Sequence, residues 1–160
     1  MRWARPRVSR EAVGWAAVVV LLVTMQWPML KGTWYKRTHA VPPPSRIAWQ
    51  TDLDVALAEA QRSGRPILVD FAADWCPPCI TMKHDVWPDP GVAAAVRDGY
   101  VPLLVDIDQR PDVAARYGVS GIPSVMVLDE EGEVVRTAAF LGADGMRRFL
   151  EGADRGPAGE

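Results

Sequence analysis

The stretch ILVDFAADWCPPCITM, residues 67–82, contains both cysteines of the 160-residue chain, with two prolines between them. Its first six residues, 67–72, are a compact apolar run that predicts a buried strand. Asp70 interrupts this run, at a depth where a charged side chain is rarely found. A carboxyl inside a buried strand, shortly before a cysteine pair, is the first feature that a functional interpretation has to explain.

Cys76 and Cys79 follow the predicted strand so closely that Cys76 should begin a helix, with Cys79 one turn further along. Free N–H groups and the dipole at a helix N-terminus stabilise a thiolate, which lowers a cysteine pKa from about 8.5 to between roughly 3.5 and 7.5. Cys76 is therefore predicted to be the nucleophile and Cys79 the resolving thiol of a mixed disulfide. Pro77 and Pro78 suit the first helical positions, because their fixed φ fits and no N–H is needed there.

Three roles compete for this cysteine pair: a structural disulfide, a metal site and a redox couple. A disulfide that closes a four-residue loop removes little entropy from the unfolded chain, so it would stabilise the fold poorly. A metal site would need two more ligands, and the histidines His84 and His39 lie in a predicted helix and a predicted linker. Redox exchange is favoured, with the Cys76–Cys79 disulfide as the redox group, no other cofactor and no metal.

The N-terminal region combines a basic arm, residues 1–11, with an uncharged stretch of 19 residues, 12–30. As a helix this stretch is roughly 28 Å long, close to the thickness of the hydrocarbon core of a bilayer. A core helix should have a polar face, and a cleaved signal peptide should have small residues where Trp27 and Pro28 stand. We therefore expect a retained transmembrane signal anchor.

The charge of the chain is unevenly distributed, although its formal total is −2. Residues 1–40 contain seven basic side chains and one acidic one, whereas residues 41–160 contain 11 basic and 19 acidic ones, a net charge of −8. The acidic part would repel a phosphate backbone, so nucleic-acid binding is not expected. Four arginines before the apolar stretch and three basic residues after it favour a single-pass protein of the inner (cytoplasmic) membrane. Its acidic part would face the periplasm or cell exterior.

The rest of the chain is predicted to be a linker, residues 31–46, a folded domain, residues 47–153, and a flexible tail, residues 154–160. Prolines 42–44 would stiffen the linker into a strut, or the linker would be a disordered spacer. Alternating helices and strands predict an α/β domain with a mixed, mostly parallel central sheet, covered on both faces and ending in an antiparallel hairpin. Helices are predicted between 52 and 64 and at 80–84, 91–98, 111–117 and 143–152, and strands at 67–72, 101–107, 124–128 and 133–139.

Two longer stretches resemble the thioredoxin family: VDFAADWCPPC, residues 69–79, and VDIDQRPDVAARYGVSGIPSVMVLDEEGEVV, residues 105–135. The resemblance covers residues 47–152. The motifs ADWC at 73–76 and DPGV at 89–92 are most similar to the C-terminal domain of DsbD-type thiol:disulfide interchange proteins and to membrane-anchored relatives of that domain. The resemblance implies a thioredoxin-like fold and thiol:disulfide exchange.

The resemblance also implies roles for single residues. Trp75 would shield one side of the dithiol, and Asp70 would act as a buried general base for Cys79, although a purely structural Asp70 stays open. Pro123 would be cis, against a frequency of about 5–6% for cis X–Pro bonds. It would face the dithiol, keep metals away, and let the backbone of Ile122 pair with an extended substrate. The predicted substrate-contacting residues are Trp75, Pro77, Pro78, Ile122 and Pro123.

One position departs from the family pattern. Leu104 stands where many cytoplasmic thioredoxins have a buried lysine, so Asp70 would lack a cationic neighbour and favour its protonated form. Pro77 and Pro78 also differ from the commonest Gly-Pro pair. The reduction potentials of the family, which span about −270 to −120 mV, therefore do not transfer to this chain.

We predict a membrane-anchored, extracytoplasmic thiol:disulfide oxidoreductase that reduces disulfide-containing proteins. Reduction is favoured because the sequence keeps Asp70 and has no histidine between the cysteines to stabilise the thiolate further. The apolar helix has no cysteine, so a separate membrane protein would supply the electrons. The alternatives are a disulfide-forming oxidase or isomerase, a non-catalytic module that holds peptides beside Pro123, and a copper-binding module that uses Cys76, Cys79 and His84.

Overall fold

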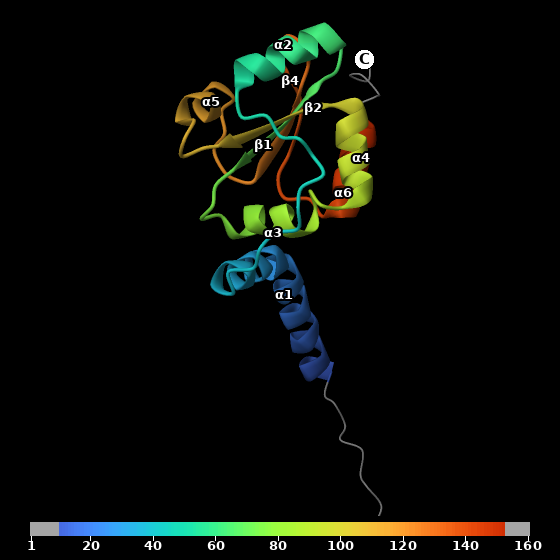
Figure 1. Ribbon diagram of the computed structural model, residues 1–160. Coiled ribbons are helices and arrows are strands. Elements are labelled where there is room, and N and C mark those ends of the chain that lie inside the picture. Colours follow the sequence, from blue (N-terminus) through green and yellow to red (C-terminus); the bar gives the residue numbers. More distant parts are fainter. Residues whose placement is uncertain (1–9, 153–160) are drawn as a thin grey trace, which may run out of the picture.

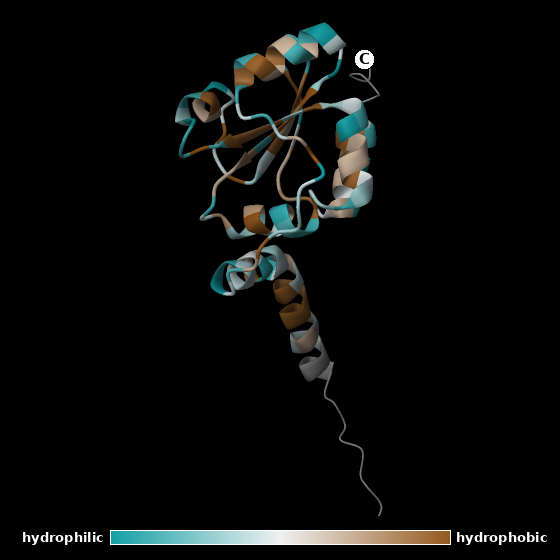
Figure 2. Ribbon diagram, viewed as in Figure 1, coloured by the Kyte–Doolittle hydropathy of each residue, from teal (hydrophilic) through white to brown (hydrophobic). Residues whose placement is uncertain are grey.

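Helix α1, Arg10–Arg37, leads into an α/β unit in the computed structural model, which describes residues 10–152 (Figure 1). Most of the predicted basic arm and the whole predicted tail lie outside the described residues. Between Gly14 and Arg37, α1 is long and apolar enough to cross a membrane, judged by length and composition. Figure 2 shows apolar residues concentrated in the middle of α1, where side chains such as Leu21 and Leu22 are exposed.

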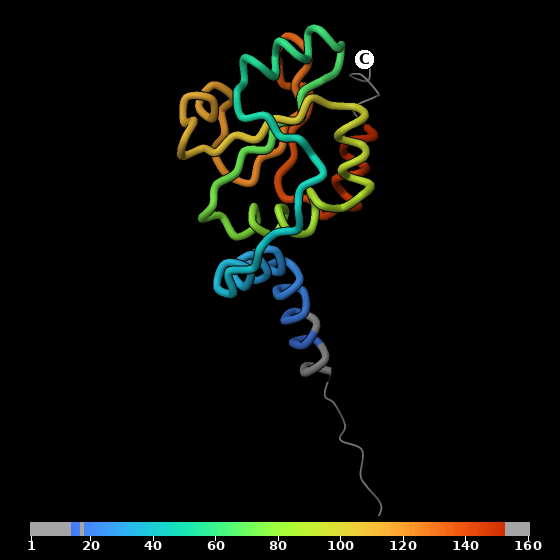
Figure 3. The backbone as a smooth tube through the Cα atoms, viewed as in Figure 1, coloured from blue at the N-terminus to red at the C-terminus, as the bar shows by residue number. Residues whose placement is uncertain are grey.

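Helix α1 is longer than the predicted anchor helix, because residues 31–37, which we expected in the linker, are helical. Pro28 lies inside α1, and Figure 3 shows that the helix bends as it reaches the α/β unit. A proline removes one backbone hydrogen bond, which bends a helix without necessarily ending it. The end of α1 packs against helix α3, Pro77–Asp85, and this packing supplies the stabilisation that the local sequence does not reveal.

Four strands form one sheet in the order β2-β1-β3-β4. Strand β1 pairs in parallel with β2, whereas β1 with β3 and β3 with β4 are antiparallel pairs. The sheet is mixed, as predicted, but the expectation that it is mostly parallel is wrong. The strands are β1 Ile67–Ala72, β2 Val101–Asp106, β3 Ser124–Leu128 and β4 Val134–Ala138.

The register between β1 and β3 gives the direction of β3. Ser124, at the start of β3, pairs with Phe71 near the end of β1, and Leu128 pairs with Ile67 at the start of β1. Because β1 and β2 are parallel, β3 starts at the edge of the sheet where β2 ends and runs in the opposite direction. The connection between β2 and β3 contains helix α5, Pro111–Arg116.

The other helices begin and end at signals that the sequence contains. Helix α2, Leu53–Ser63, is capped by the side chain of Asp52 and ends at Gly64, whose φ of 64° suits glycine. Helix α4, Pro90–Gly99, begins after Asp89, whose side chain also caps the helix. Helix α6, Ala143–Glu151, closes the fold.

Both faces of the sheet are covered, as predicted (Figure 1). Helices α2 and α5 pack on one face around Val69 and Phe71, and helices α3, α4 and α6 pack on the other face around Leu68 and Val125. Side chains alternate between the two faces along a strand, so β1 contributes to both cores. Asp70 shares its face with Leu68 and therefore lies on the α3 side of the sheet.

Candidate dithiol site

Cys76 and Cys79 form a disulfide at the start of α3, with their Cα atoms 5.3 Å apart. Cys76 is the N-cap residue of α3, and its Sγ accepts a hydrogen bond of 3.3 Å from the backbone N–H of Cys79. This confirms the predicted placement of both cysteines. Their side chains are nearly buried, with exposed fractions of 2% for Cys76 and 7% for Cys79. A thiolate at Cys76 would accept the N–H of Cys79 and lie at the positive end of the α3 dipole, and both stabilise it.

Pro77 and Pro78 occupy the first two positions of α3. Neither position needs a backbone N–H donor for the helix, so two successive prolines leave the hydrogen bonding of α3 intact. The first N–H donor of this turn beyond Cys79 belongs to Ile80, which donates to the carbonyl of Cys76 at 3.0 Å. The prolines therefore restrict the conformation of the loop that joins the two cysteines.

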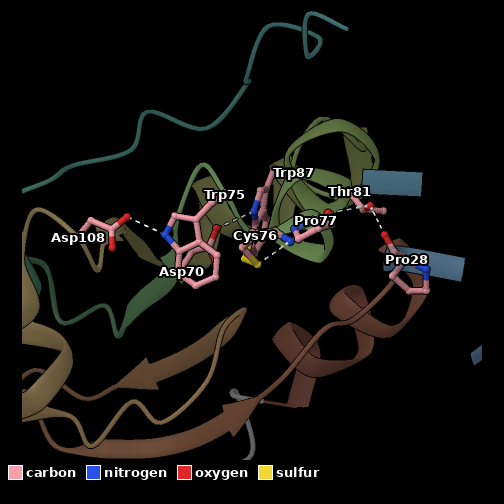
Figure 4. Close-up of a disulfide and its surroundings, with 9 residues drawn as sticks. Pro28, Asp70, Trp75, Cys76, Pro77, Thr81, Trp87 and Asp108 are labelled. Carbon is pink, nitrogen blue, oxygen red and sulfur yellow. Dashed lines mark hydrogen bonds between the residues drawn. A yellow bond between two sulfur atoms is a disulfide. The ribbon is translucent and has the colours of Figure 1, made fainter. Parts of the chain in front are cut away.

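Asp70 lies in the middle of β1 and is 4% exposed. Its Oδ2 accepts a hydrogen bond of 2.8 Å from Nε1 of Trp87 (Figure 4), whereas its Oδ1 has no partner among residues 10–152. Burial raises the pKa of Asp70 from 3.8 to about 7, against the smaller lowering effect of the bond from Trp87. Leu104 is the neighbour of Asp70 on β2. The register therefore places an apolar side chain, and not a lysine, beside the carboxyl, as predicted.

A cavity of about 370 Å³ connects Asp70 with the buried side of the dithiol. Cys79, Trp87 and Leu104 line it together with Asp70. The further charged groups in its wall are Asp74, Lys83 and Asp106. A carboxyl with a pKa near neutrality, in a cavity that Cys79 also lines, can accept or return a proton there.

The proline segment at 42–44 forms one wall of this cavity. We expected it to be a strut or a loose spacer, but it lies against the α/β unit instead. Trp49, which follows in sequence, also lines the cavity and packs edge-on against Trp87, with ring centroids 5.1 Å apart. Sequence reasoning missed Trp87 and Trp49 as parts of the site, because no spacing relates them to the cysteines.

The loop before β3 contains a cis peptide bond between Ile122 and Pro123, as the family resemblance implied. Pro123 is buried, Ile122 is half-buried, and both line an open groove with Pro78 of the dithiol loop. The structure therefore brings these three predicted residues together in one groove at the start of α3.

Trp75 precedes Cys76 and is 54% exposed. Its Nε1 donates a hydrogen bond of 2.8 Å to Asp108 Oδ2, which orients the indole beside the disulfide (Figure 4). Asp108 lies in the turn after β2 and was not identified from the sequence. His84, considered as a copper ligand, stacks instead on the ring of Tyr35 from α1, with centroids 4.0 Å apart.

The family model described as Thioredoxin-like matches residues 48–130. Over 104 residues, 59% of the chain, the sequence is 35% identical to the thiol:disulfide interchange protein DsbD 1 of Pseudomonas aeruginosa, of which it covers 17%. Over 85 residues, 52% of the chain, it is 40% identical to a thioredoxin of Streptomyces clavuligerus, of which it covers 74%.

The oxidised DsbD C-terminal domain of Neisseria meningitidis has a similar fold, with a TM-score of 0.54 at 24% identity over 69% of this chain and 100% of that one. The predicted resemblance to thioredoxins and to DsbD is therefore confirmed, although the chain spans less than a fifth of the length of the DsbD protein from Pseudomonas aeruginosa. The chain, with its Cys-x-x-Cys disulfide, therefore belongs to the thioredoxin-like family.

Proposed function

We propose that this protein is a membrane-anchored, extracytoplasmic oxidoreductase that reduces disulfide-containing proteins. The arrangement that supports this most is Cys76 as the N-cap of α3, with Cys79 one turn further along and the buried carboxyl of Asp70 on β1. Each group has the environment that its role requires. Cys76 has the Cys79 N–H and the dipole of α3 to favour a thiolate, and Asp70 shares a cavity with Cys79.

The reaction consists of two exchange steps. The thiolate of Cys76 attacks one sulfur of the substrate disulfide, forms a mixed disulfide and releases the other substrate sulfur as a thiolate. Cys79 passes its proton to Asp70 and attacks Sγ of Cys76, which breaks the mixed disulfide and releases the second substrate thiolate. The two electrons of the dithiol have then passed to the substrate, and the Cys76–Cys79 disulfide must be reduced again.

The open groove beside Pro123 is the proposed place for the substrate segment around the attacked disulfide. Ile122 and Pro78 border this groove, and Trp75 lies beside the disulfide (Figure 4). An extended segment there would pair with the backbone of Ile122 in the manner of an added strand. The residues that line the groove would then determine which substrate side chains fit beside the dithiol.

The proposed direction is reduction of partners, and the reduction potential tests it. Asp70 is retained, and no histidine stands between the cysteines to stabilise the Cys76 thiolate further. Equilibration with glutathione buffers, followed by quantification of the Cys76–Cys79 disulfide, gives the midpoint. We expect a thioredoxin-like value, whereas a midpoint above about −150 mV would assign the protein to the disulfide-forming oxidases.

The proposed anchor is the apolar part of α1, and the proposed electron donor is a separate membrane protein. The described part of α1 has no cysteine, so it cannot itself carry electrons to the dithiol. The proposal needs no metal and no cofactor besides the disulfide. In alkaline carbonate, the full-length protein should stay in the membrane pellet. Release into the supernatant would contradict a retained anchor.

A second candidate function is a non-catalytic module that holds peptides, and the groove beside Pro123 supports it. Two cysteine variants distinguish this function from catalysis. Cys76→Ser should abolish insulin reduction, while Cys79→Ser should accumulate mixed disulfides whose partners can be identified. Insulin reduction that survives in Cys76→Ser would favour the non-catalytic module.

A further inference from the structure

The end of α1 is fitted against the dithiol loop, and we call residues 28–35 the docking segment. Gly32 is the buried residue at its centre. A Cβ atom on Gly32 would lie 1.7 Å from the carbonyl oxygen of Pro77 and 2.3 Å from its carbonyl carbon. These are backbone atoms that cannot move aside, so the helix approaches Pro77, the first of the two residues between the cysteines, as closely as a glycine permits.

A buried hydroxyl joins the same two elements. Thr81 of α3 is 4% exposed, and its Oγ1 lies 2.8 Å from the carbonyl oxygen of Pro28 and 3.2 Å from that of Pro77 (Figure 4). Pro28 lies inside α1, which bends as it approaches the α/β unit (Figure 3). The bend turns the docking segment toward α3.

The far end of α3 is held by a second group of contacts. Asp85 accepts hydrogen bonds from Lys31 Nζ at 2.6 Å and from the Tyr35 hydroxyl at 2.9 Å. The Tyr35 ring stacks on His84 with an angle of 8° between the ring planes. The docking segment therefore contacts α3 from Pro77 to Asp85. Since partly exposed ion pairs contribute little, the specificity of this contact comes from the close fit at Gly32 and from Thr81.

The contact has a consequence for the position of the dithiol. The uncharged stretch of α1 ends at Leu30, two residues before Gly32, so the docked helix α3 lies directly above the apolar part of α1 (Figure 1). The cleft between α1 and the α/β unit and the groove beside Pro123 share Phe140 in their walls. The proposed substrate groove therefore adjoins the cleft that Trp27, Pro28 and Lys31 of α1 line.

We propose that the docking segment is a clamp that holds the dithiol at a fixed height and orientation at the membrane surface, with Gly32 as its positioning residue. The clamp makes the protein selective for a membrane-bound partner that presents its disulfide at that surface. This inference rests on the membrane anchoring proposed above. Without the clamp, the sixteen residues 31–46 would act as a flexible tether with a span of roughly 20–24 Å. The effective concentration of the dithiol at the surface would then fall.

The test uses the full-length protein in nanodiscs and one disulfide-bonded peptide, either free in solution or coupled to lipid headgroups through a short linker. Single-turnover reduction is compared for the wild type, Gly32→Leu and Gly14→Leu. Gly14 lies in the same helix with open space around it, so this control adds the same side chain without touching the α/β unit.

Gly32→Leu should reduce the short-tethered peptide at least fivefold more slowly than the wild type, and the free peptide at a rate within twofold of the wild type. Gly14→Leu should behave like the wild type with both peptides. The deficit of Gly32→Leu should disappear as the lipid linker is lengthened, because a long linker reaches an undocked dithiol. Equal rates of Gly32→Leu and wild type with the short-tethered peptide, or an equal loss with both peptides, would overturn the clamp.

A second readout does not depend on reductase activity. A maleimide on the same short lipid linker should alkylate Cys76 of the reduced wild-type protein, and this alkylation should also slow at least fivefold in Gly32→Leu. Such a result in a protein that reduces neither peptide would support the clamp and reject the reductase function. Equal alkylation of both proteins would reject the clamp alone.

Discussion

The indole N–H of Trp87 donates a hydrogen bond of 2.8 Å to Oδ2 of Asp70, and this is the one polar protein contact of that carboxyl among residues 10–152. A hydrogen bond from a neutral donor stabilises the carboxylate less than burial destabilises it. Burial therefore dominates, and the pKa of Asp70 rises to about 7. Near neutral pH the carboxyl exists in both protonation states, which suits its proposed exchange of a proton with Cys79.

The first prediction concerns the rate at which Cys79 resolves a mixed disulfide. This rate should rise as the pH increases through about 7, because Asp70 becomes able to accept a proton. Asp70→Asn should slow resolution roughly 10- to 100-fold at pH 7.5 and remove this pH step. Single-turnover stopped-flow measurements from pH 5 to 9 check it. An unchanged pH profile in Asp70→Asn would assign Asp70 a structural role.

The second prediction concerns stability. The folded-state pKa of Asp70 is raised from 3.8 to about 7, so between these values the folded protein keeps a proton that the unfolded chain has lost. Stability therefore falls as the pH rises through this window. From pH 5 to 9, Asp70 should lower the free energy of unfolding by about 3 kcal/mol. Urea unfolding of the wild type and Asp70→Asn should show this loss in the wild type alone.

A third prediction separates the two indoles near Asp70. Trp87→Phe removes the N–H donor, so the pKa of Asp70 should rise further and the pH step of resolution should move to higher pH. It should also lower the free energy of unfolding by about 1–3 kcal/mol, because a buried polar group loses its partner. Trp49→Phe is the matched control, since Trp49 packs against Trp87 without a hydrogen bond to Asp70. A step at the wild-type pH in Trp87→Phe would contradict the prediction.

The fourth prediction uses the register between β1 and β2, in which Asp70 is paired with Leu104. Leu104 also lines the Asp70 cavity, so Leu104→Lys would place a cation near the carboxyl. A neighbouring cation lowers a carboxyl pKa by about 1–3. The step in the pH profile of mixed-disulfide resolution should therefore move to lower pH by the same amount. Leu104→Met, which adds length without charge, should leave the step in place. NMR titration of the Asp70 carboxyl carbon provides an independent check.

Local sequence determined much of the candidate site. A strand, a helix start and a cysteine pair adjoin within residues 67–82, so short-range spacing was enough to predict Cys76 as N-cap and Cys79 one turn further along. Alternation along the strand likewise limited Asp70 to one of two faces. The cis bond before Pro123 could be expected from the family resemblance, although residue statistics alone favour trans.

The tertiary structure decided the contacts that join distant segments. Trp87 reaches Asp70 across 17 residues, because the chain after α3 folds back over β1. The direction of β3 is given by its antiparallel register with β1, which the local sequence does not encode. The helical residues 31–37 include Gly32, which packs against Pro77, a contact between positions 45 residues apart. Composition and periodicity report the local preferences of a chain, whereas these features arise from burial and close packing between segments that only the folded chain brings together.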